Sequence, residues 1–541
     1  MLDSAPNRDF KSLFSGSNKI FSLAIVFIFL VLGVCGLANH EMWRDELQAW
    51  LIARDSGSPL DLIQNLRYEG HPGLWHSLLY LVTRFTNNPA YMQLVHLAIG
   101  VGNVALIVFF SPFSRLQKFF LSFSFFIFYE YLIVSRNYSI AVLLIFLICS
   151  LYHLRDKKPL TIMVVLGLLA NTNFYGWMIS IGFAIVFGLD FLQKQLTGFE
   201  ASKTVLKNRA RAILGAVFYI ASVATSFLLV MPPDDRWRGT DSTTYISLSH
   251  LVHSATALAK AYVPILEHKI QFWDTNLLLN LTLSSLEYPY KLVVPLVLSG
   301  SIIAFSIWLI KKSRNAFLIY LIGTGLMFSF TYVKYHGAAR HHGNFFILLI
   351  ACIWIAFSEA SYSEDKDSLT KRGSEARQKV FSIIFTLFLG VHFFAGIWPY
   401  FIDFQYPFSM QKNAADYLSR YEDSNNFKIA GYRSSYASPL AANLETDIYY
   451  PQAEKYGSFI VWKKDSVELM EHSEIIGDLI QKAHEFETNW ILVLNEPISS
   501  SSMESYNQRG KVSIAELKRF TGSIVQEDFY IYEVMVADKI S

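Results

Sequence analysis

An acidic segment, His40-Glu41-Met42-Trp43-Arg44-Asp45-Glu46, directly follows the first apolar run of the chain. Its residue types suit proton transfer. A carboxyl group beside a membrane loses part of its hydration, and desolvation raises its pKa toward working pH. We therefore expect Asp45 to act as a general base, with Glu46 beside it. The alternative is a solvated polar face on a helix at the membrane surface, without chemistry.

Helical periodicity over residues 40–52 divides this segment into two faces. One face carries Trp43, Leu47, Trp50 and Leu51, and the other carries Glu41, Asp45, Gln48 and Ile52. The pattern predicts a helix in the plane of the membrane interface, with both tryptophans at headgroup depth. Asp45 and Glu41 are then raised toward whatever the protein encloses.

A second acidic site closes the same loop, in the segment Tyr68-Glu69-Gly70-His71-Pro72-Gly73-Leu74-Trp75. Pro72 can begin a helix, so Glu69 and His71 are expected just before a helical N-terminus. Two acidic sites in one loop, each flanked by aromatic residues, suggest one shared reaction site. We expect Asp45, Glu46 and Glu69 to be its catalytic residues, with Glu41 and His71 in contact with substrate.

Two further segments carry cations that could hold a phosphate. Ser135-Arg136-Asn137-Tyr138 is a short turn between apolar runs, and the segment from Lys334 to Gly343 has five possible cations within nine residues. The residues expected to bind phosphate are Arg136, Tyr138, Lys334, Arg340 and His341. Arg136 could instead be a snorkelling arginine, and the second segment could bind anionic lipid headgroups. Zinc binding by its histidines is disfavoured, because no thiolate and no regular spacing support it.

The long loop after Pro232-Pro233 opens on Asp234-Asp235-Arg236-Trp237-Arg238. These residues could contribute to a site for an acceptor or a sugar. The start of a solvated loop explains them equally well, and both interpretations stay open at this point.

Apolar runs long enough to cross a bilayer must position these residues. Of the 541 residues, 52% are hydrophobic and only 17% are charged, which is too apolar for a soluble globular chain. A spanning helix needs roughly 20 apolar residues, because lipid offers its backbone no hydrogen-bond partner. We expect about eleven transmembrane helices, near residues 20–37, 91–110, 119–134, 138–153, 160–170, 178–192, 212–231, 292–310, 316–333, 345–357 and 381–398. The first is interpreted as a retained anchor rather than a signal peptide, since no small-residue cleavage site follows its long core.

Lys and Arg cluster in alternate loops, which predicts orientation. The clusters are Arg115 with Lys118; Arg155, Lys157 and Lys158; Lys203, Lys207, Arg209 and Arg211; Lys311, Lys312 and Arg314; and Lys371, Arg372, Arg377 and Lys379. Under the positive-inside rule these loops are cytoplasmic. The N-terminus is then cytoplasmic and the loop 39–88 faces outward, in what we expect to be a bacterial inner (plasma) membrane. The net charge of +2 gives no sign of nucleic-acid binding, and the three cysteines fall inside apolar runs.

The residues after Asp403 have a different pattern. Strand-like runs near 427–432, 490–494 and 529–534 alternate with helical patterns near 411–421 and 475–486. The sequence therefore predicts a transmembrane module over 1–402, with its catalytic outer loop at 39–88, and an extracytoplasmic α/β domain over 403–541.

These motifs resemble those of the class C glycosyltransferases, and most of all the branch of the protein O-mannosyltransferases and aminoarabinose transferases. The shared order is a span, an Asp-Glu pair, about two dozen residues, Glu-x-His-Pro and an amphipathic helix. Asp45-Glu46 matches the acidic pair of the family, and Glu69 with the following Pro72-x-Leu74-Trp75 matches its second motif. The Arg-x-Tyr element at Arg136 is similar as well. The resemblance covers roughly residues 20–400 in layout.

One departure lies beside Glu69, where Gly70, His71 and Gly73 replace the lysine or second proline often found in the family. The departure leaves open which neighbour of Glu69 contacts the donor.

The resemblance implies transfer of a sugar from a polyprenyl-phosphate-linked donor to a protein, lipid or glycan acceptor on the outer face. It implies direct displacement at the anomeric carbon with inversion, with Asp45 as base. Arg340, helped by Arg136 and a histidine or Lys334, would stabilise the leaving phosphate. Some class C relatives coordinate a divalent metal with acidic pairs, which is the alternative here, but this branch generally needs none, so no metal cofactor is expected. No nucleotide-binding motif is found.

Two other classes of protein are weighed against this interpretation. A transporter or lipid flippase would place its ionisable residues near the middle of its spans, often with internal repeats. Here the charged residues gather at the outer ends, and no repeat is seen. A non-catalytic scaffold would explain the C-terminal region but not the acidic and cationic clusters.

Overall fold

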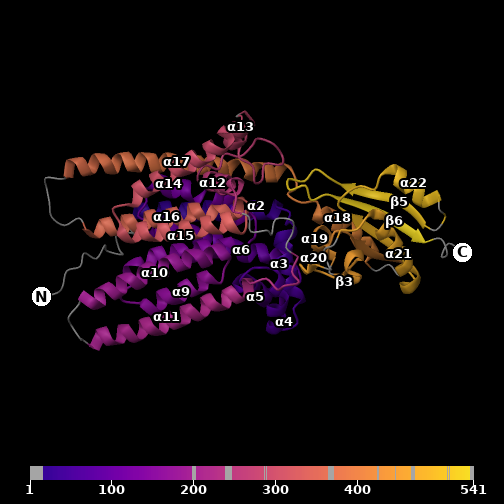
Figure 1. Ribbon diagram of the computed structural model, residues 1–541, viewed down its shortest axis with the longest axis horizontal. Helices are drawn as coiled ribbons and strands as arrows, with labels where there is room; N and C mark the ends of the chain where they lie inside the picture. The colour runs from indigo at the N-terminus through magenta and orange to yellow at the C-terminus, as the bar shows by residue number, and fades with distance from the viewer. Residues whose placement is uncertain are drawn as a thin grey trace.

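The computed structural model describes residues 16–197, 203–237, 246–285, 287, 289–363, 371–422, 426–444, 446–464, 469–508, 510 and 512–536. A body of long, roughly parallel helices lies at one end of the longest axis, and a smaller domain with a β-sheet lies at the other (Figure 1). Arg238, noted in the sequence, lies outside the described residues.

The long helices coincide with the apolar runs of the sequence. They are α2 (Gly16–Asn39), α6 (Ala90–Phe110), α7 (Arg115–Ser122) with the π-helix η2 (Phe125–Ile133), α8 (Tyr138–Leu151) with η3 (Tyr152–Leu154), α9 (Pro159–Ala170), α10 (Phe174–Thr197), α11 (Lys203–Val230), α14 (Tyr290–Ile310), α15 (Arg314–Val333), α16 (Ala339–Ser363) and α17 (Lys371–Gln405). Within the described ranges, nine helical segments are long and apolar enough to cross a membrane, and the segments 138–154 and 159–170 are shorter. The protein is therefore a polytopic membrane protein, as predicted.

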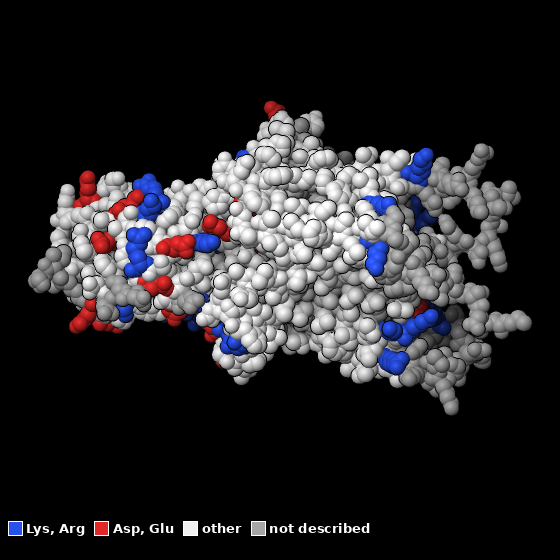
Figure 2. Space-filling view, turned by 180° about the vertical axis from the view of Figure 1, so that it is seen from behind, with Lys and Arg blue, Asp and Glu red and all other residues white. Residues whose placement is uncertain are grey.

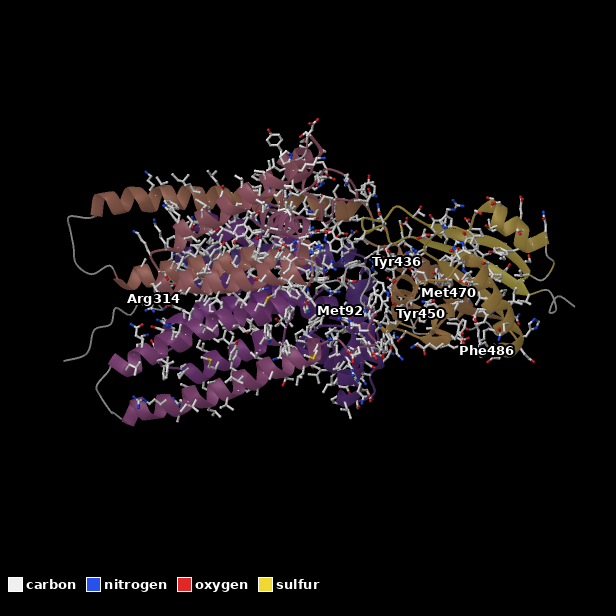
Figure 3. The ribbon with its side chains drawn as sticks, viewed as in Figure 1. Met92, Arg314, Tyr436, Tyr450, Met470 and Phe486 are labelled. Atoms are coloured by element: carbon white, nitrogen blue, oxygen red, sulfur yellow. The ribbon has the colours of Figure 1, made fainter. Side chains whose placement is uncertain are left out.

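One face of the helical body has a wide band across its middle with few charged side chains among the described residues. Figure 2 shows this band, with Lys and Arg gathered near the end of the helices that lies away from the sheet. Exposed apolar side chains such as Leu228, Val297 and Leu387 cover helices of this body. Arg314, at the start of α15, lies at the charged end (Figure 3). Such a pattern is typical of a surface that faces lipid between two aqueous layers.

Shorter elements of the first loop lie where the helical body meets the sheet domain (Figure 1). They are α3 (Arg44–Asp55), α4 (Pro59–Asn65), η1 (Leu66–Tyr68) and α5 (Leu74–Thr83). In the loop before α14, α12 (Leu248–Tyr262) packs against α14, α15 and α16, and α13 (Leu277–Ser285) protrudes from the helical body. Helix α3 begins at Arg44 rather than near His40. The carboxylate of Glu46 accepts the N–H of Trp43 (3.2 Å), which satisfies an unpaired donor at the helix N-terminus.

The prediction that α3 lies on the membrane surface is wrong. Trp43 is 4% exposed and Trp50 is fully buried, and Trp43 packs edge-on against Trp273 with ring centroids 4.8 Å apart. Leu47 and Leu51 pack into a core formed with the C-terminal domain. Helix α3 is thus buried between the two parts of the molecule, and protein covers the face that the periodicity assigned to lipid.

The C-terminal domain has a six-stranded mixed sheet in the order β3-β2-β1-β4-β6-β5. Its strands are β1 (Phe427–Gly431), β2 (Ile448–Tyr450), β3 (Lys455–Gly457), β4 (Asn489–Leu494), β5 (Val512–Phe520) and β6 (Phe529–Val536). Strand β1 runs parallel to β2 and β4, and the other pairs are antiparallel. Its helical elements are α18 (Gln411–Leu418), η4 (Ser419–Tyr421), α19 (Ser434–Ala437), η5 (Ser438–Leu440), α20 (Ala441–Leu444), η6 (Pro451–Ala453), α21 (His472–Phe486) and α22 (Ser500–Gln508). The α/β class was predicted, but β2, β3 and β5 were not.

Candidate active site

Asp45, in the first turn of α3, receives two arginines at the junction of the two parts. Nη2 of Arg340 donates a hydrogen bond to Oδ2 of Asp45 (3.0 Å), and Nη1 of Arg136 lies 3.5 Å from the same oxygen. Arg136 also donates to the backbone carbonyl of Asp45. The carboxylate stays 28% exposed, whereas both arginine side chains are largely buried. Three segments that are distant in the sequence therefore converge on one carboxylate.

The pKa of Asp45 lies below its ordinary value. Burial acts to raise it, but the charges of Arg136, Arg340 and Arg44 outweigh burial and favour the ionised form. The prediction that desolvation raises this pKa is therefore wrong. Asp45 is an anion at neutral pH in this state.

Two indole rings hold Arg340. Its guanidinium carbon lies 5.3 Å from the ring centroids of both Trp43 and Trp273, which suits cation–π attraction. Trp273 Nε1 in turn donates to Oε2 of Glu130 (3.0 Å). Among the described residues, Nε of Arg340 and Oε1 of Glu130 are buried without a hydrogen-bond partner. A buried donor and a buried acceptor can each take one more polar partner beside Asp45.

Aromatic side chains surround His341, the residue after Arg340. Its ring centroid lies 5.7 Å from those of Tyr138 and Tyr175 and 5.1 Å from that of Tyr335. Nδ1 of His341 accepts the backbone N–H of Ala338 (2.9 Å), so in the neutral ring Nε2 carries the proton. The structure thus brings together Arg136, Tyr138, Arg340 and His341, four of the five residues expected to hold phosphate.

Lys334, the fifth, does not join this group. It is exposed at the end of α15 and makes no ion pair with any described residue. His342 turns its Nε2 toward the backbone oxygen of His336 (2.7 Å). The cationic segment of the sequence is therefore divided, because α16 begins at Ala339 and separates Lys334 from the residues of its first turn.

Glu69 reaches the same site through Gln48, one turn after Asp45 on α3. Nε2 of Gln48 donates to Oε1 of Glu69 (2.8 Å) and to the backbone oxygen of Ile460 (2.9 Å). Oε1 of Gln48 accepts the N–H of Ile460 (3.0 Å). Burial raises the pKa of Glu69 to about 7. Glu69 can therefore exchange a proton near neutral pH, beside an Asp45 that stays ionised.

Arg236 closes the other side of Glu69. Its Nη2 donates to the backbone oxygen of Glu69 (3.2 Å), and its guanidinium packs on Gly70. Gly70 has φ +72°, and a Cβ there would lie 3.0 Å from Nη1 of Arg236, so both the backbone and the contact require glycine. Burial and the charge of Arg136 hold the pKa of His71 well below its ordinary value, so His71 is neutral.

Glu46 faces away from the open site. Its Oε1 accepts the N–H of Ser135 (2.6 Å), and its Oε2 accepts the N–H of Trp43 and lies 3.1 Å from Nε2 of His40. Both oxygens are occupied and the side chain is buried. Glu46 therefore ties α3 to the turn that carries Arg136, and the structure gives it no direct path to a substrate.

His40 extends this network to the end of α17. Its Nδ1 lies 2.7 Å from Oδ2 of Asp403, and Tyr129 donates to the same oxygen (3.3 Å). Burial acts to lower the pKa of His40, but Asp403 and Glu46 outweigh it and raise the pKa to about 10. His40 is thus an imidazolium that joins two carboxylates.

Thermal stability is expected to fall as pH rises from about 6.5 to about 10. A raised pKa stabilises the fold fully below the unfolded value of 6.5, and this contribution is lost as pH passes the folded value. The contribution is on the order of 4 kcal/mol. His40→Gln should lower the unfolding midpoint in detergent at pH 6 and flatten its pH dependence across this window. Equal slopes for both proteins would contradict the assignment.

Glu41 lies apart from Asp45. The charged groups that act on it most strongly are Lys412 and its neighbour His40, and Asp416 follows, so it faces α18. Burial raises its pKa to about 7, and its Oε2 is buried without a partner among the described residues. The structure does not bring Glu41 to the site that it was predicted to share.

Arg44 fastens α3 to the C-terminal domain. Its guanidinium carbon lies 4.3 Å from the ring centroid of Tyr436, and its Nε lies 3.8 Å from Oε1 of Glu527. Figure 3 shows Tyr436 at the inner end of this domain, next to the helical body. Burial raises the pKa of Glu527 to about 7. These contacts place the C-terminal domain over α3.

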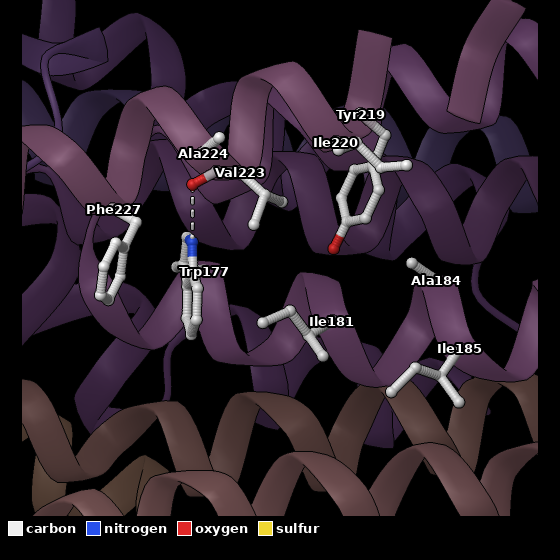
Figure 4. Close-up of a pocket in the computed structure, with 9 residues that line it drawn as sticks. All are labelled: Trp177, Ile181, Ala184, Ile185, Tyr219, Ile220, Val223, Ala224 and Phe227. Atoms are coloured by element: carbon white, nitrogen blue, oxygen red, sulfur yellow. Dashed lines mark hydrogen bonds between the residues drawn. The ribbon is translucent and has the colours of Figure 1, made fainter. Parts of the chain in front are cut away.

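An apolar groove of about 320 Å³ runs between α10 and α11 (Figure 4). Its lining residues are Trp177, Ile181, Ala184, Ile185, Tyr219, Ile220, Val223, Ala224 and Phe227. Trp177 stands at one end, with its Nε1 donating to the backbone oxygen of Val223 (3.2 Å). Two residues earlier, Tyr175 contacts His341 of the arginine site and does not line the groove. Helix α10 therefore carries both a wall of the groove and a contact of the arginine site.

Among the described residues, no group of three His, Cys, Asp or Glu side chains is placed to hold a metal ion.

No family model matches the sequence, and no curated protein matches it. The structure is similar to the crystal structure of ArnT from Cupriavidus metallidurans bound to undecaprenyl phosphate, with a TM-score of 0.50 and 10% sequence identity. The similarity covers 96% of this chain and 98% of that chain. At this identity it shows the fold, and it confirms the resemblance drawn from the acidic motifs. The chain has the fold of the class C glycosyltransferases, in the form found in the aminoarabinose transferase ArnT.

Proposed function

We propose that this protein is a membrane glycosyltransferase that moves a sugar from a polyprenyl-phosphate-linked donor to an acceptor. The observation that carries the proposal is the pair Arg136 and Arg340 on the single oxygen of Asp45. Two buried guanidinium groups on one carboxylate leave a surplus positive charge, which suits a phosphate. ArnT, which has the same fold, binds undecaprenyl phosphate.

The reaction that fits these residues is a direct displacement with inversion. An acceptor hydroxyl or amine attacks the anomeric carbon, its proton passes to Asp45, and the bond from that carbon to the phosphate oxygen breaks. Arg340 and Arg136 stabilise the charge left on the phosphate. When the phosphate takes up these guanidinium groups, Asp45 loses the interactions that depress its pKa and becomes a stronger base. Glu69 orients the acceptor beside it.

The groove between α10 and α11 is our candidate for the polyprenyl chain of the donor. It has no polar lining apart from Tyr219, whose hydroxyl is bonded to Ser180 (3.1 Å), and the Trp177 ring. An apolar groove beside a helix that also contacts His341 suits the hydrocarbon chain of a lipid whose phosphate lies at the arginine site.

A bulky side chain in the groove should impair transfer only from donors that have a long polyprenyl chain. Ala184→Trp is expected to raise KM for an undecaprenyl-linked donor about tenfold, because a few methylenes lose their contact with protein. KM for a donor with two isoprene units should not change. Leu387→Trp, at an exposed position of α17, is the matched control. An equal effect on both donors would remove the groove from the donor site.

We expect titration of Glu69 to produce an inflection near pH 7 in the pH profile of kcat/KM. In the free enzyme kcat/KM should fall below pH 7, as Glu69 takes up a proton and loses its charge. Glu69→Gln keeps the shape and the acceptor for Gln48, so it should lower kcat/KM about tenfold or more and abolish the inflection. Glu41→Gln is the control, because Glu41 has the same raised pKa away from Asp45. An inflection that persists in Glu69→Gln would contradict this role.

We place the site on the outer face of a bacterial inner membrane, with a cytoplasmic N-terminus. The Lys and Arg clusters of the sequence support this orientation, since Lys and Arg gather at the end of the helical body away from the sheet domain (Figure 2). Purified protein in vesicles, given a radiolabelled polyprenyl-phosphate sugar and membrane extract as acceptor, should release polyprenyl phosphate and label the acceptor. Movement of the lipid between leaflets without transfer would identify a flippase instead.

A further inference from the structure

Two short segments from distant parts of the chain pair above Glu69. Arg236 forms an antiparallel bridge with Lys463. The N–H of Trp237 donates to the oxygen of Trp462 (2.9 Å), and the N–H of Lys464 donates to the oxygen of Asp235 (3.1 Å). The loop after α11 is thus joined to the C-terminal domain directly beside the candidate site.

The pairing sorts side chains onto two faces, since successive residues of an extended segment point to opposite sides. Arg236 points inward, because its guanidinium reaches the backbone of Glu69 and packs on Gly70. Trp237 therefore points outward. Its ring stacks with that of Trp462, with centroids 5.8 Å apart and an interplanar angle of 21°. Trp237 is nevertheless 43% exposed, so part of its indole ring is accessible to a ligand.

Polar groups border this aromatic pair. Tyr68, the residue before Glu69, donates its hydroxyl to Asp235, with 3.1 Å and 3.0 Å to the two carboxylate oxygens. Nζ of Lys463 lies 3.9 Å from Oδ2 of Asp235. A flat apolar surface therefore adjoins a carboxylate, a phenol and an ammonium group, at the position next to Glu69 in the chain.

We propose that this surface, the platform of Trp237, Trp462, Asp235, Tyr68 and Lys463, is a subsite for a carbohydrate acceptor. The C–H face of a sugar ring is apolar with partial positive charge and suits the negative face of an indole. Its hydroxyl groups, at the ring edge, match the donors and acceptors that border the platform. The proposal rests on the proposed function and adds the class of acceptor.

An anionic lipid headgroup fits the platform less well. Asp235 follows Asp234, which is also exposed, and two carboxylates repel a phosphate. One face of Trp237 is covered by Trp462 instead of entering lipid. A glycan acceptor that reaches across the platform would bring its next sugar to Glu69 and Asp45.

The test uses the full-length protein in detergent on an array of neutral and acidic oligosaccharides. We expect binding to at least one oligosaccharide class, reduced about tenfold or more in Trp237→Ala and Trp462→Ala and mostly kept in Trp237→Phe. Trp308→Ala, at an exposed position of α14, should bind as the unmodified protein does. Absence of binding by the unmodified protein, or equal binding by all variants, would overturn the platform.

Two further measurements distinguish a failure of the platform proposal from a failure of the proposed transferase function. The platform variants should bind undecaprenyl phosphate normally and show a raised acceptor KM with little change in kcat. If the protein transfers sugar to a protein, or to a lipid without sugar, and substitution of either tryptophan has no effect, the platform is refuted. The proposed transferase function is then still supported. Oligosaccharide binding without any sugar transfer would support the platform and contradict the proposed transferase function.

Discussion

Asp45→Asn is expected to reduce sugar transfer by roughly 10²–10⁴-fold, the range lost when a general base is removed. The substitution keeps the size of the side chain and removes its charge. Arg136 and Arg340 then have no counter-charge in the resting protein, so donor phosphate should bind as tightly as before or more tightly. The measurements are turnover with a labelled donor and the dissociation constant for undecaprenyl phosphate.

The same variant should also be less stable without ligand, because two buried guanidinium groups lose their shared partner. Undecaprenyl phosphate should restore part of the unfolding midpoint. Asp61→Asn, in α4 of the same loop, is the matched control and should change neither quantity. Near-normal turnover of Asp45→Asn would show that another group accepts the proton.

Arg340→Ala is expected to weaken binding of undecaprenyl phosphate by roughly 10–100-fold, the effect of one charge-assisted hydrogen bond to a buried anion. It should lower kcat as well, since the charge on the leaving phosphate develops in the transition state. Arg340→Lys should rescue only part of the loss. Lysine keeps the charge but cannot offer a planar fork to the phosphate, and it lacks the delocalised guanidinium that lies 5.3 Å from the ring centroids of Trp43 and Trp273.

Arg433→Ala serves as the control for Arg340→Ala and Arg340→Lys, because Arg433 forms an exposed ion pair with Glu496 in the C-terminal domain. Donor affinity that is unchanged in Arg340→Ala would remove Arg340 from the phosphate site. A full rescue by lysine would show that charge alone matters at this position.

The membrane helices could be predicted from the sequence because lipid imposes one simple requirement. Every spanning segment must be long, apolar and helical, so all eleven runs appear as helices. The strands of the C-terminal domain were harder to predict from the sequence. Strands β1, β4 and β6 have buried apolar runs, whereas β2 and β3 have three residues each and β5 is an edge strand with Glu516, Lys518 and Arg519. Polar edge strands do not differ in pattern from loops.

The site could be predicted only in part. The acidic and cationic motifs drew attention to Asp45, Glu69, Arg136 and Arg340, and the structure brings these residues to one place. Periodicity failed for Trp43, since a pattern reports an apolar face but not whether lipid or protein covers it.

The partners of these groups come from far along the chain. Gln48 meets Ile460, Arg236 meets Glu69, and His40 meets Asp403. No pattern of neighbouring residues in the sequence predicts such pairs. The Asp235-Arg236-Trp237 motif was noticed, but its bridge to Lys463 could not be predicted from the sequence.

The burial of α3 between the two parts has a consequence for biosynthesis. The ribosome makes Asp45 more than 400 residues before Ile460, whose backbone holds Gln48, and 363 residues separate His40 from Asp403. Until the strands that carry Ile491 and Ile531 have been made, Leu47 and Leu51 lack part of the core that covers them, and Gln48 lacks the backbone of Ile460. A chain that stops early in the C-terminal domain therefore leaves α3 uncovered, although Asp45, Arg136 and Arg340 have all been synthesised.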